Sequence, residues 1–354
     1  MLGYFRLLAA IGVLVGHVSN FLSNGTSRAM VGAFFIVSGY LIAMTVSENY
    51  RGRPMAFYRN RFLRVFPTYW LIAGCTALAG APWWIDYYEA LPQGERLMSV
   101  FRTFALCFDD ARRLVGPAWS LPYELSYYLL APLLIGFTIR RTPVGLPAFA
   151  LLSVAGFAAV SSPWLLLHPF GIGYSSPWLL ASFVLFAAGA LIYQSRLRLS
   201  RRLQGLGLGL LACVIAMGCR YVAPDGAAYD MGSALYVGTA AYAATALVLL
   251  SWDRKESPGS KLAGDLCYPV YLLHWPLLNS PLLEWQTTRA LTDWFGRLFP
   301  MGQIVAACVI GIVATLLLSW LIVLLERRYI ATFRAERGSA PSSHGAIVTL
   351  PRAS

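Results

Sequence analysis

The chain of 354 residues is 58% hydrophobic and only 12% charged, whereas a soluble globular domain carries roughly 25% charged residues. Its mean hydropathy of +0.60 and its apolar runs of about 20 residues, the length of a bilayer span, argue against a soluble enzyme and against a nucleic-acid-binding module. The net charge of +12 is therefore interpreted as a signal of membrane orientation, with no nucleic-acid partner expected.

The apolar runs predict an all-α fold, a polytopic membrane bundle of about ten transmembrane helices in contact with the lipid bilayer. In chain order, the predicted spans cover residues 4–22, 29–47, 65–82, 118–137, 145–160, 175–193, 204–221, 231–252, 262–283 and 301–325. The longest predicted loop, around 83–117, contains charged residues and prolines. We expect residues 1–330 to form one membrane domain, and residues 331–354 to form a disordered cytoplasmic tail because this segment is polar and rich in Ser and Pro.

The distribution of basic residues predicts the orientation of the bundle. If the N-terminus is cytoplasmic, twenty of the 28 Lys and Arg residues lie on the cytoplasmic side and eight on the outer side. The opposite orientation reverses this ratio. We therefore expect both termini in the cytoplasm.

The first predicted span carries two ionisable residues, Arg6 and His17. An ionisable residue in a span costs about 2.5–3.5 kcal/mol on insertion scales, so it usually has a function or a partner. Eleven residues correspond to about three helical turns, which places both side chains on one face, about 16 Å apart along the axis. Two interpretations stay open: a functional pair, or an arginine that extends to the membrane surface and a histidine that bonds a neighbouring helix.

The segment from the second to the third predicted span combines small residues with basic ones. Residues 34–40 read F-F-I-V-S-G-Y, in which Ser38 and its neighbouring glycine allow two helices to pack closely. The cytoplasmic segment that follows contains Arg61 and Arg64, which present two guanidinium groups to one side of a short helix and suit a phosphorylated ligand. The alternative is a topogenic charge cluster that binds anionic lipid.

The fourth predicted span opens with W-S-L-P-Y-E at residues 119–124. Glu124 lies about two turns into the membrane, at a depth comparable with that of His17, and Ser120 faces the same way because it is spaced i,i+4. A carboxylate at this depth is suited to hold one tautomer of a general-base imidazole. The alternative is a glutamate that is bonded to tyrosine hydroxyls.

The ninth predicted span contains a polar and aromatic stripe of Tyr268, Tyr271, His274 and Trp275 at helical spacing. Such a stripe is suited to line a channel for an acceptor by stacking. It is equally typical of an aromatic belt at the membrane interface, with a kink at Pro276. Both interpretations stay open at this point.

Other chemical motifs are absent from the sequence. The six cysteines form no C-x-x-C pair and lie mostly in apolar runs, which is typical of buried thiols. There is no Walker A pattern, no H-E-x-x-H and no G-x-S-x-G. We therefore expect no metal site and no tightly bound cofactor.

Taken in chain order, five segments resemble the membrane acyltransferase-3 family, ten-span O-acyltransferases of surface polysaccharides and macrolides. The matching patterns are Arg6-x10-His17, the F-F-x-x-S-G-Y-L run from residue 34, Arg61-x-x-Arg64-x-x-Pro67, Trp119-Ser120-Leu121-x-x-Glu124 and Tyr268-x-x-Tyr271-Leu272-x-His274-x-Pro276. The resemblance covers about residues 1–330. This chain departs from the family's pattern at Tyr4-Phe5, where many members have Asp-Gly, and at Glu326-Arg327-Arg328, where the pattern is Glu-Arg-Pro.

The resemblance implies an O-acyltransferase of the inner (plasma) membrane, which moves an acyl group, expected to be acetyl, from cytoplasmic acyl-CoA (acetyl-CoA) to a hydroxyl of a carbohydrate such as an exopolysaccharide or O-antigen unit. It implies that His17 acts as general base or acyl carrier, that Glu124 orients it, and that Arg6 belongs to the same catalytic set. It further implies that CoA phosphates bind Arg61 and Arg64, and that a substrate channel is lined by Ser38, Trp119, Tyr268, Tyr271 and His274.

A different class of protein also fits the charged residues in the spans. A proton-coupled transporter, or a flippase of a lipid-linked glycan, places His, Glu and Arg in the bilayer as well. The cytoplasmic R-x-x-R pattern favours the enzyme, because a transporter does not need a phosphate clamp beside the third span.

Overall fold

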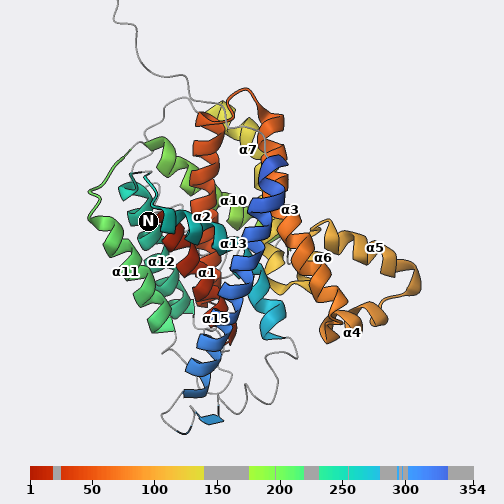
Figure 1. Cartoon of the computed structure of the whole chain (residues 1–354). Coiled ribbons are helices and arrows are strands. Elements are labelled where there is room, and N and C mark those ends of the chain that lie inside the picture. Colours follow the sequence, from red (N-terminus) through yellow and green to blue (C-terminus); the bar gives the residue numbers. More distant parts are fainter. Residues whose placement is uncertain are drawn as a thin grey trace, which may run out of the picture.

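The computed structural model describes residues 1–18, 25–138, 175–195, 197–218, 231–253, 255–279, 293–294, 297 and 302–333. Throughout these residues the regular structure is helical (Figure 1). The helices are α1 (Leu2–Val18), α2 (Gly25–Glu48), α3 (Pro54–Leu78), α4 (Pro82–Ala90), α5 (Gln93–Phe104), α6 (Phe108–Leu114), α7 (Leu121–Thr138), α10 (Ser175–Ser195), α11 (Leu203–Gly218), α12 (Met231–Ser251), α13 (Pro258–Leu278) and α15 (Gly302–Leu325). Short helical turns are η1 (Gly116–Ser120), η4 (Glu326–Ile330) and η5 (Ala331–Phe333).

Each predicted span has a matching helix except 145–160, which lies outside the described residues, as does the predicted tail beyond residue 333. Two of these helices are long and apolar enough to cross a membrane, over Ala29–Glu48 and Val305–Ile330. A third crosses if Pro54–Leu78 and Pro82–Ala90, bent by 82°, form one broken span. Within the described residues the fold is all-helical, as expected for a membrane protein, and the total of ten spans stays a prediction.

The predicted loop at 83–117 was wrong, because this segment is folded into α4, α5, α6 and η1. The sequence encodes these helices locally: Pro82 occupies the first turn of α4, and α5 has Glu95 in its first turn and Arg102 in its last. The arm they form extends sideways from the bundle beside α3 (Figure 1). Tyr69 holds it there, since its hydroxyl donates to the Thr103 carbonyl at 2.6 Å.

The core of the bundle is built around α2, which packs against α1, α7, α10 and α12. At Gly39 of α2 an added Cβ would lie 2.0 Å from the carbonyl oxygen of Phe186, and at Gly189 of α10 it would lie 1.8 Å from that of Ile36. The small residues predicted to allow close packing therefore do so, because the backbones of α2 and α10 touch.

The outer surface of α15 is apolar. Its exposed side chains include Val309, Val313, Leu317, Trp320, Leu321 and Leu324. No described element covers this apolar stripe. It is suited to face lipid, because lipid tails are as apolar as these side chains.

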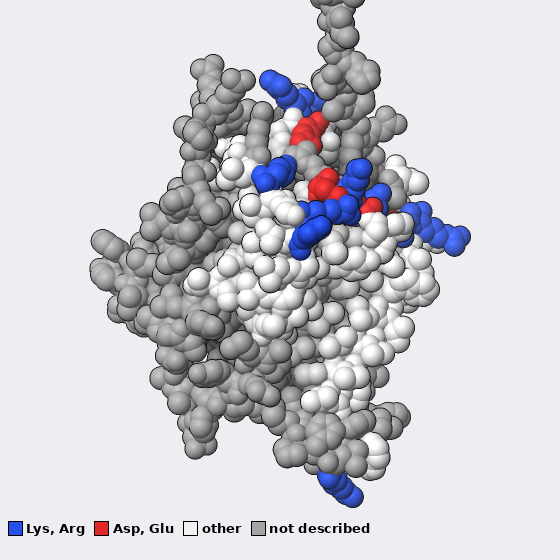
Figure 2. All heavy atoms as spheres, turned by 90° about the vertical axis from the view of Figure 1, so that its left-hand side faces the viewer, with Lys and Arg blue, Asp and Glu red and all other residues white. Residues whose placement is uncertain are grey.

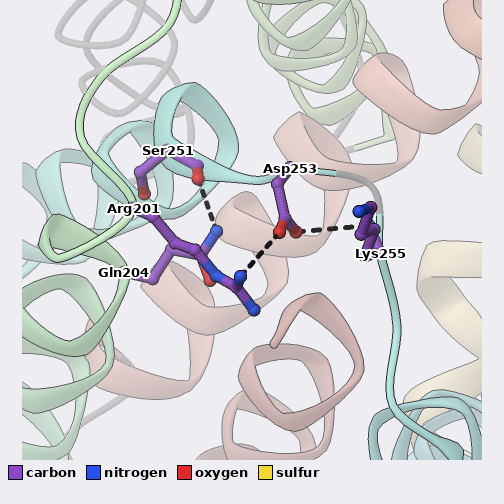
Figure 3. Close-up of polar contacts among 5 residues, drawn as sticks. All are labelled: Arg201, Gln204, Ser251, Asp253 and Lys255. Atoms are coloured by element: carbon purple, nitrogen blue, oxygen red, sulfur yellow. Dashed lines mark hydrogen bonds and ion pairs between the residues drawn. The ribbon is translucent and has the colours of Figure 1, made fainter.

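Charged side chains gather at one end of the bundle. On the face shown in Figure 2, most of the described Lys, Arg, Asp and Glu residues cluster toward the upper end, above a broad uncharged region, and a basic side chain lies at the lower end. Figure 3 shows how two basic segments are joined: Arg201 pairs with Asp253 at 3.2 Å, and the backbone N–H of Lys255 donates to the same carboxylate at 3.2 Å. Gln204 adds a hydrogen bond to the Ser251 carbonyl, so the start of α11 and the end of α12 lie together.

Candidate active site

Six of the ten predicted site residues line a cavity of about 50 Å³, which we call the inner cavity. It lies between helices that are far apart in the sequence. Its lining includes Arg6 of α1, Phe34, Phe35 and Ser38 of α2, Arg64 and Val65 of α3, Ser120 of η1, Leu121, Glu124 and Tyr128 of α7, and Cys267, Tyr268 and Tyr271 of α13. All five sequence patterns therefore supply polar side chains to one space.

Glu124 is held by two hydroxyl groups. Ser38 Oγ donates to its Oε1 at 3.2 Å, and the hydroxyl of Tyr128, one turn further along α7, donates to the same oxygen. We call Ser38, Glu124 and Tyr128 the carboxylate cluster. The expected hydrogen bond between Glu124 and His17 is not formed, because both side chains bond elsewhere. The tyrosine-bonded alternative describes Glu124 better. Tyr128 was missed, although its i,i+4 spacing from Glu124 was visible in the sequence.

His17 is bonded to a second histidine. Its Nδ1 lies 2.8 Å from Nε2 of His274, and Nδ1 of His274 lies 3.2 Å from the carbonyl oxygen of Val270. The ring centroids are 5.0 Å apart and the ring planes differ by 15°. His274 is fully buried and His17 is partly buried. These two residues, the histidine pair, lie outside the lining of the inner cavity.

Tyr271 connects the histidine pair with the inner cavity. Its ring contacts that of His274 at a centroid distance of 6.3 Å, and it also lines the cavity. Its hydroxyl lies 2.8 Å from Ser120 Oγ and donates to the Pro117 carbonyl at 3.0 Å. The start of α7 is thereby fixed to α13. Trp119, in contrast, does not line the cavity, and its ring packs against Tyr123 at 6.0 Å.

The predicted stripe on α13 follows from how this helix begins. Ser257 caps it by accepting a hydrogen bond from the Ser260 N–H at 3.2 Å, and Pro258 occupies the first position. From this start, Tyr268, Tyr271 and His274 lie on one side of the helix at i, i+3 and i+6. The first two line the cavity, and the third bonds His17.

The two predicted phosphate-binding arginines have different surroundings. Because α3 begins at Pro54, both lie within this helix. Arg64 lines the inner cavity, whereas Arg61 does not. The guanidinium of Arg61 lies 5.3 Å from the ring centroids of Phe57 and Tyr128, a cation–π geometry. Arg61 therefore packs against the ring of Tyr128, a member of the carboxylate cluster, and does not face the inner cavity.

A second cavity of about 70 Å³, the end cavity, shares Arg64 and Tyr268 with the inner cavity. Its other lining residues are Gly264, Asp265, Pro269, Val323, Glu326 and Arg327. Asp265 and Arg327 form an ion pair at 2.6 Å, and Tyr268 donates a hydrogen bond to the Val65 carbonyl at 2.9 Å. Asp265 was missed by sequence analysis, because an acidic residue near the start of a predicted span has no distinctive spacing, and Glu326 was named there only as part of the closing Glu-Arg-Pro pattern. Within the described residues, no cluster of three or more His, Cys, Asp or Glu is placed to hold a metal.

The sequence is similar to known proteins. Residues 2–324 match the family model described as an acyltransferase domain. The chain is 27% identical over 308 residues to Nodulation protein 10 of Rhizobium leguminosarum bv. viciae, an alignment that covers 78% of this chain and 82% of that protein.

Other relatives align over shorter segments. The O-acetyltransferase OatA of Staphylococcus aureus is 28% identical over 159 residues, which are 38% of this chain and 24% of OatA. Protein 2 in the picA locus of Rhizobium radiobacter is 30% identical over 145 residues, which are 35% of this chain and 76% of that protein. No solved structure matches. The family match spans nearly all of the helical bundle, and the chain belongs to the acyltransferase-3 family of membrane O-acyltransferases.

Proposed function

We propose that this O-acyltransferase moves an acetyl group from cytoplasmic acetyl-CoA to a hydroxyl of a carbohydrate, such as an exopolysaccharide or O-antigen unit. The observation that carries the proposal is the inner cavity, where Arg6, Arg64, Ser38 and Glu124 meet. The name of OatA, an O-acetyltransferase, favours acetyl as the group transferred.

The donor enters through the end cavity in this proposal. Arg64 and Tyr268 form a wall common to both cavities. A CoA phosphate bound to Arg64 would then place the pantetheine arm along this wall, with the thioester in the inner cavity. Charge-assisted hydrogen bonds from a guanidinium suit a phosphate, because its planar donors match the phosphate oxygens. The gathering of most charged residues at one end of the bundle supports a cytoplasmic location for that end. A cytoplasmic location of both termini is part of the proposal and rests on the distribution of basic residues in the sequence.

His17 supplies the proton chemistry. As a general base it removes the proton of the acceptor hydroxyl; the oxygen attacks the thioester carbonyl, the C–S bond breaks, and CoA leaves as a thiolate that takes up a proton. As an acyl carrier, His17 attacks the thioester first and then passes the acyl group to the hydroxyl. Since His17 lies outside the lining of the inner cavity, the general-base route, with the acceptor hydroxyl between the imidazole and the thioester, fits this arrangement better than direct attack by His17 on the thioester.

The test compares two arginines with different surroundings. In the purified full-length protein, Arg64→Lys removes the guanidinium fork from both cavities, and Arg61→Lys serves as the matched variant one turn away. Loss of a charge-assisted hydrogen bond costs about 1.5–3 kcal/mol, so acetyl-CoA should bind Arg64→Lys about tenfold more weakly or worse. Arg61→Lys should bind it with a smaller loss.

Two results would contradict the proposal. Wild-type affinity for acetyl-CoA in Arg64→Lys would leave this arginine as an orientation signal. Failure of the wild-type protein to release CoA in the presence of membranes that carry the acceptor glycan would reject the acetyl-CoA reaction and favour the transporter.

A further inference from the structure

We infer that His274 is a positioning residue that fixes the tautomer of His17, so that Nε2 of His17 carries the lone pair used in the reaction. This inference rests on the proposed role of His17 as base or nucleophile and deepens it. It gives His274 a task other than lining a substrate channel, which is where sequence analysis placed it. Three contacts around the two imidazole rings support this role.

The first contact determines the protonation of one nitrogen of His274. A carbonyl oxygen only accepts hydrogen bonds, so the contact of 3.2 Å with the Val270 carbonyl requires a proton on Nδ1 of His274. Nε2 of a neutral His274 is then an acceptor. A second proton on Nε2 would make the ring cationic, and the ring is fully buried. A buried charge without an anionic partner is costly. The described contacts of His274 are with the backbone of Val270 and Tyr271, with His17 and with the ring of Tyr271, and none of these groups is an anion.

The second contact determines which nitrogen of His17 carries the proton. Nε2 of His274 faces Nδ1 of His17 at 2.8 Å, so the proton between them belongs to His17. The rings are almost coplanar, and their centroids at 5.0 Å are much further apart than the two nitrogens. The rings therefore meet edge to edge, which is the geometry of an in-plane N–H···N hydrogen bond and not of face-to-face stacking.

The third contact limits the freedom of the His17 ring. Trp275, next to His274 on α13, packs edge-on against His17 at a centroid distance of 5.3 Å and an angle of 80°. Gly116 makes room for this indole, because a Cβ there would lie 2.8 Å from it. With Nδ1 bonded and the ring flanked by Trp275, Nε2 of His17 is the remaining nitrogen that can accept a proton or attack a carbonyl carbon.

The arrangement serves the purpose that a carboxylate serves elsewhere, with a neutral group in its place. An acceptor on Nδ1 holds a catalytic imidazole in the reactive tautomer and supports the positive charge that it acquires during the reaction. Here the acceptor is an imidazole whose own proton is tied to the backbone of α13. Glu124 is left to the carboxylate cluster.

The test uses two amide variants that differ only in reach. The side-chain oxygen of His274→Gln is suited to take the place of Nε2 and accept from His17, whereas the amide of His274→Asn reaches the position of Nδ1 and the Val270 carbonyl only. We expect kcat to fall about tenfold or more in His274→Asn, since a tenfold loss corresponds to about 1.4 kcal/mol of transition-state stabilisation. His274→Gln should stay within a few-fold of the wild type. KM for acetyl-CoA should not change in either variant.

A spectroscopic readout separates this inference from the activity. The chain has four histidines, so ring ¹⁵N spectra of histidine-labelled protein can be assigned by substituting His168 and His344 one at a time. The wild type should show His17 protonated at Nδ1 and unprotonated at Nε2, and His274→Asn should show a mixture of tautomers. A wild-type His17 protonated at Nε2, or equal kcat losses in His274→Gln and His274→Asn, would overturn the inference. Absence of CoA release together with the expected spectra would reject the proposed reaction and leave the tautomer assignment intact.

Discussion

The carboxylate cluster and the histidine pair are both polar and both lie inside the helical bundle, yet they are stabilised in different ways. Glu124 lies beside a cavity, receives hydrogen bonds from two hydroxyl groups, and shares the lining with Arg6 and Arg64. The histidine pair lies outside that lining and is tied to the backbone at Val270. An anion needs donors and nearby cations, whereas a neutral imidazole is satisfied by one acceptor and one donor, so that His274 can be buried completely. In the proposed function, the inner cavity beside the carboxylate cluster binds the donor, and the histidine pair transfers the proton. Tyr271 touches both regions, because it lines the inner cavity and its ring contacts that of His274.

The largest effect is expected at the histidine pair. His17→Ala should reduce acetyl transfer by a factor of about 100 to 10,000, because a positioned acid or base contributes this much. Binding of acetyl-CoA should be unchanged, since His17 does not line the inner cavity. CoA release and equilibrium binding measure the two quantities, with expression and membrane insertion as controls. A well-inserted His17→Ala protein that keeps most of its activity would end the assignment.

The next effect concerns the framework that positions Ser38. In Gly39→Ala the new Cβ would meet the Phe186 carbonyl at 2.0 Å, so α2 and α10 must move apart. Overpacking of this kind costs about 1–3 kcal/mol, and we expect a lower thermal midpoint in detergent. Gly74→Ala in α3 is the matched control, because nothing lies within 4 Å of a Cβ there. Equal midpoints for the two variants would show that the close contact is not needed.

A smaller effect is expected when only the charge of the carboxylate cluster is removed. Glu124→Gln keeps an oxygen that accepts hydrogen bonds from Ser38 and Tyr128 but loses the negative charge near Arg6 and Arg64. We expect about a tenfold loss in kcat/KM, in line with about 1.5–3 kcal/mol for a hydrogen bond to a charged group. The loss should be smaller than that of His17→Ala. Glu95→Gln in the exposed first turn of α5 is the control and should keep the kcat/KM of the wild type. A larger loss of kcat/KM in Glu124→Gln than in His17→Ala would assign the proton transfer to the carboxylate cluster and not to the histidine pair.

The smallest effect is expected at the wall between the two cavities. Tyr268→Phe removes the hydrogen bond to the Val65 carbonyl, which is worth about 0.5–1.5 kcal/mol. If the donor passes this wall, KM for acetyl-CoA should change a few-fold with little change in kcat. Tyr58→Phe removes a comparable bond to the Leu129 carbonyl at 2.9 Å, away from both cavities. The same KM in both variants would place the donor path elsewhere.

Much of the fold was determined by the sequence itself. Apolar runs of span length identified the helices, because a membrane leaves a chain few ways to satisfy its backbone hydrogen bonds. Local signals also fixed helix starts, such as Ser257 and Pro258 before α13. The arm of α4 to α6 was missed because its helices are short and carry charges, which resembles a loop when only apolar run length is considered.

The sequence predicted most of the residues that form the site, but not which of them contact one another. Helical periodicity placed Arg6 with His17, and Tyr268 with Tyr271 and His274, on common faces. Depth in the membrane suggested that Glu124 would meet His17, yet depth gives only one coordinate of three. The rotation of α7 and α13 about their axes decided the partners, and this rotation follows from packing over whole helix surfaces, including the contact of Tyr271 with Ser120. Partner choice inside the bundle was therefore a property of the tertiary structure, because hydrogen bonds act over about 3 Å and no sequence pattern specifies positions between helices that closely.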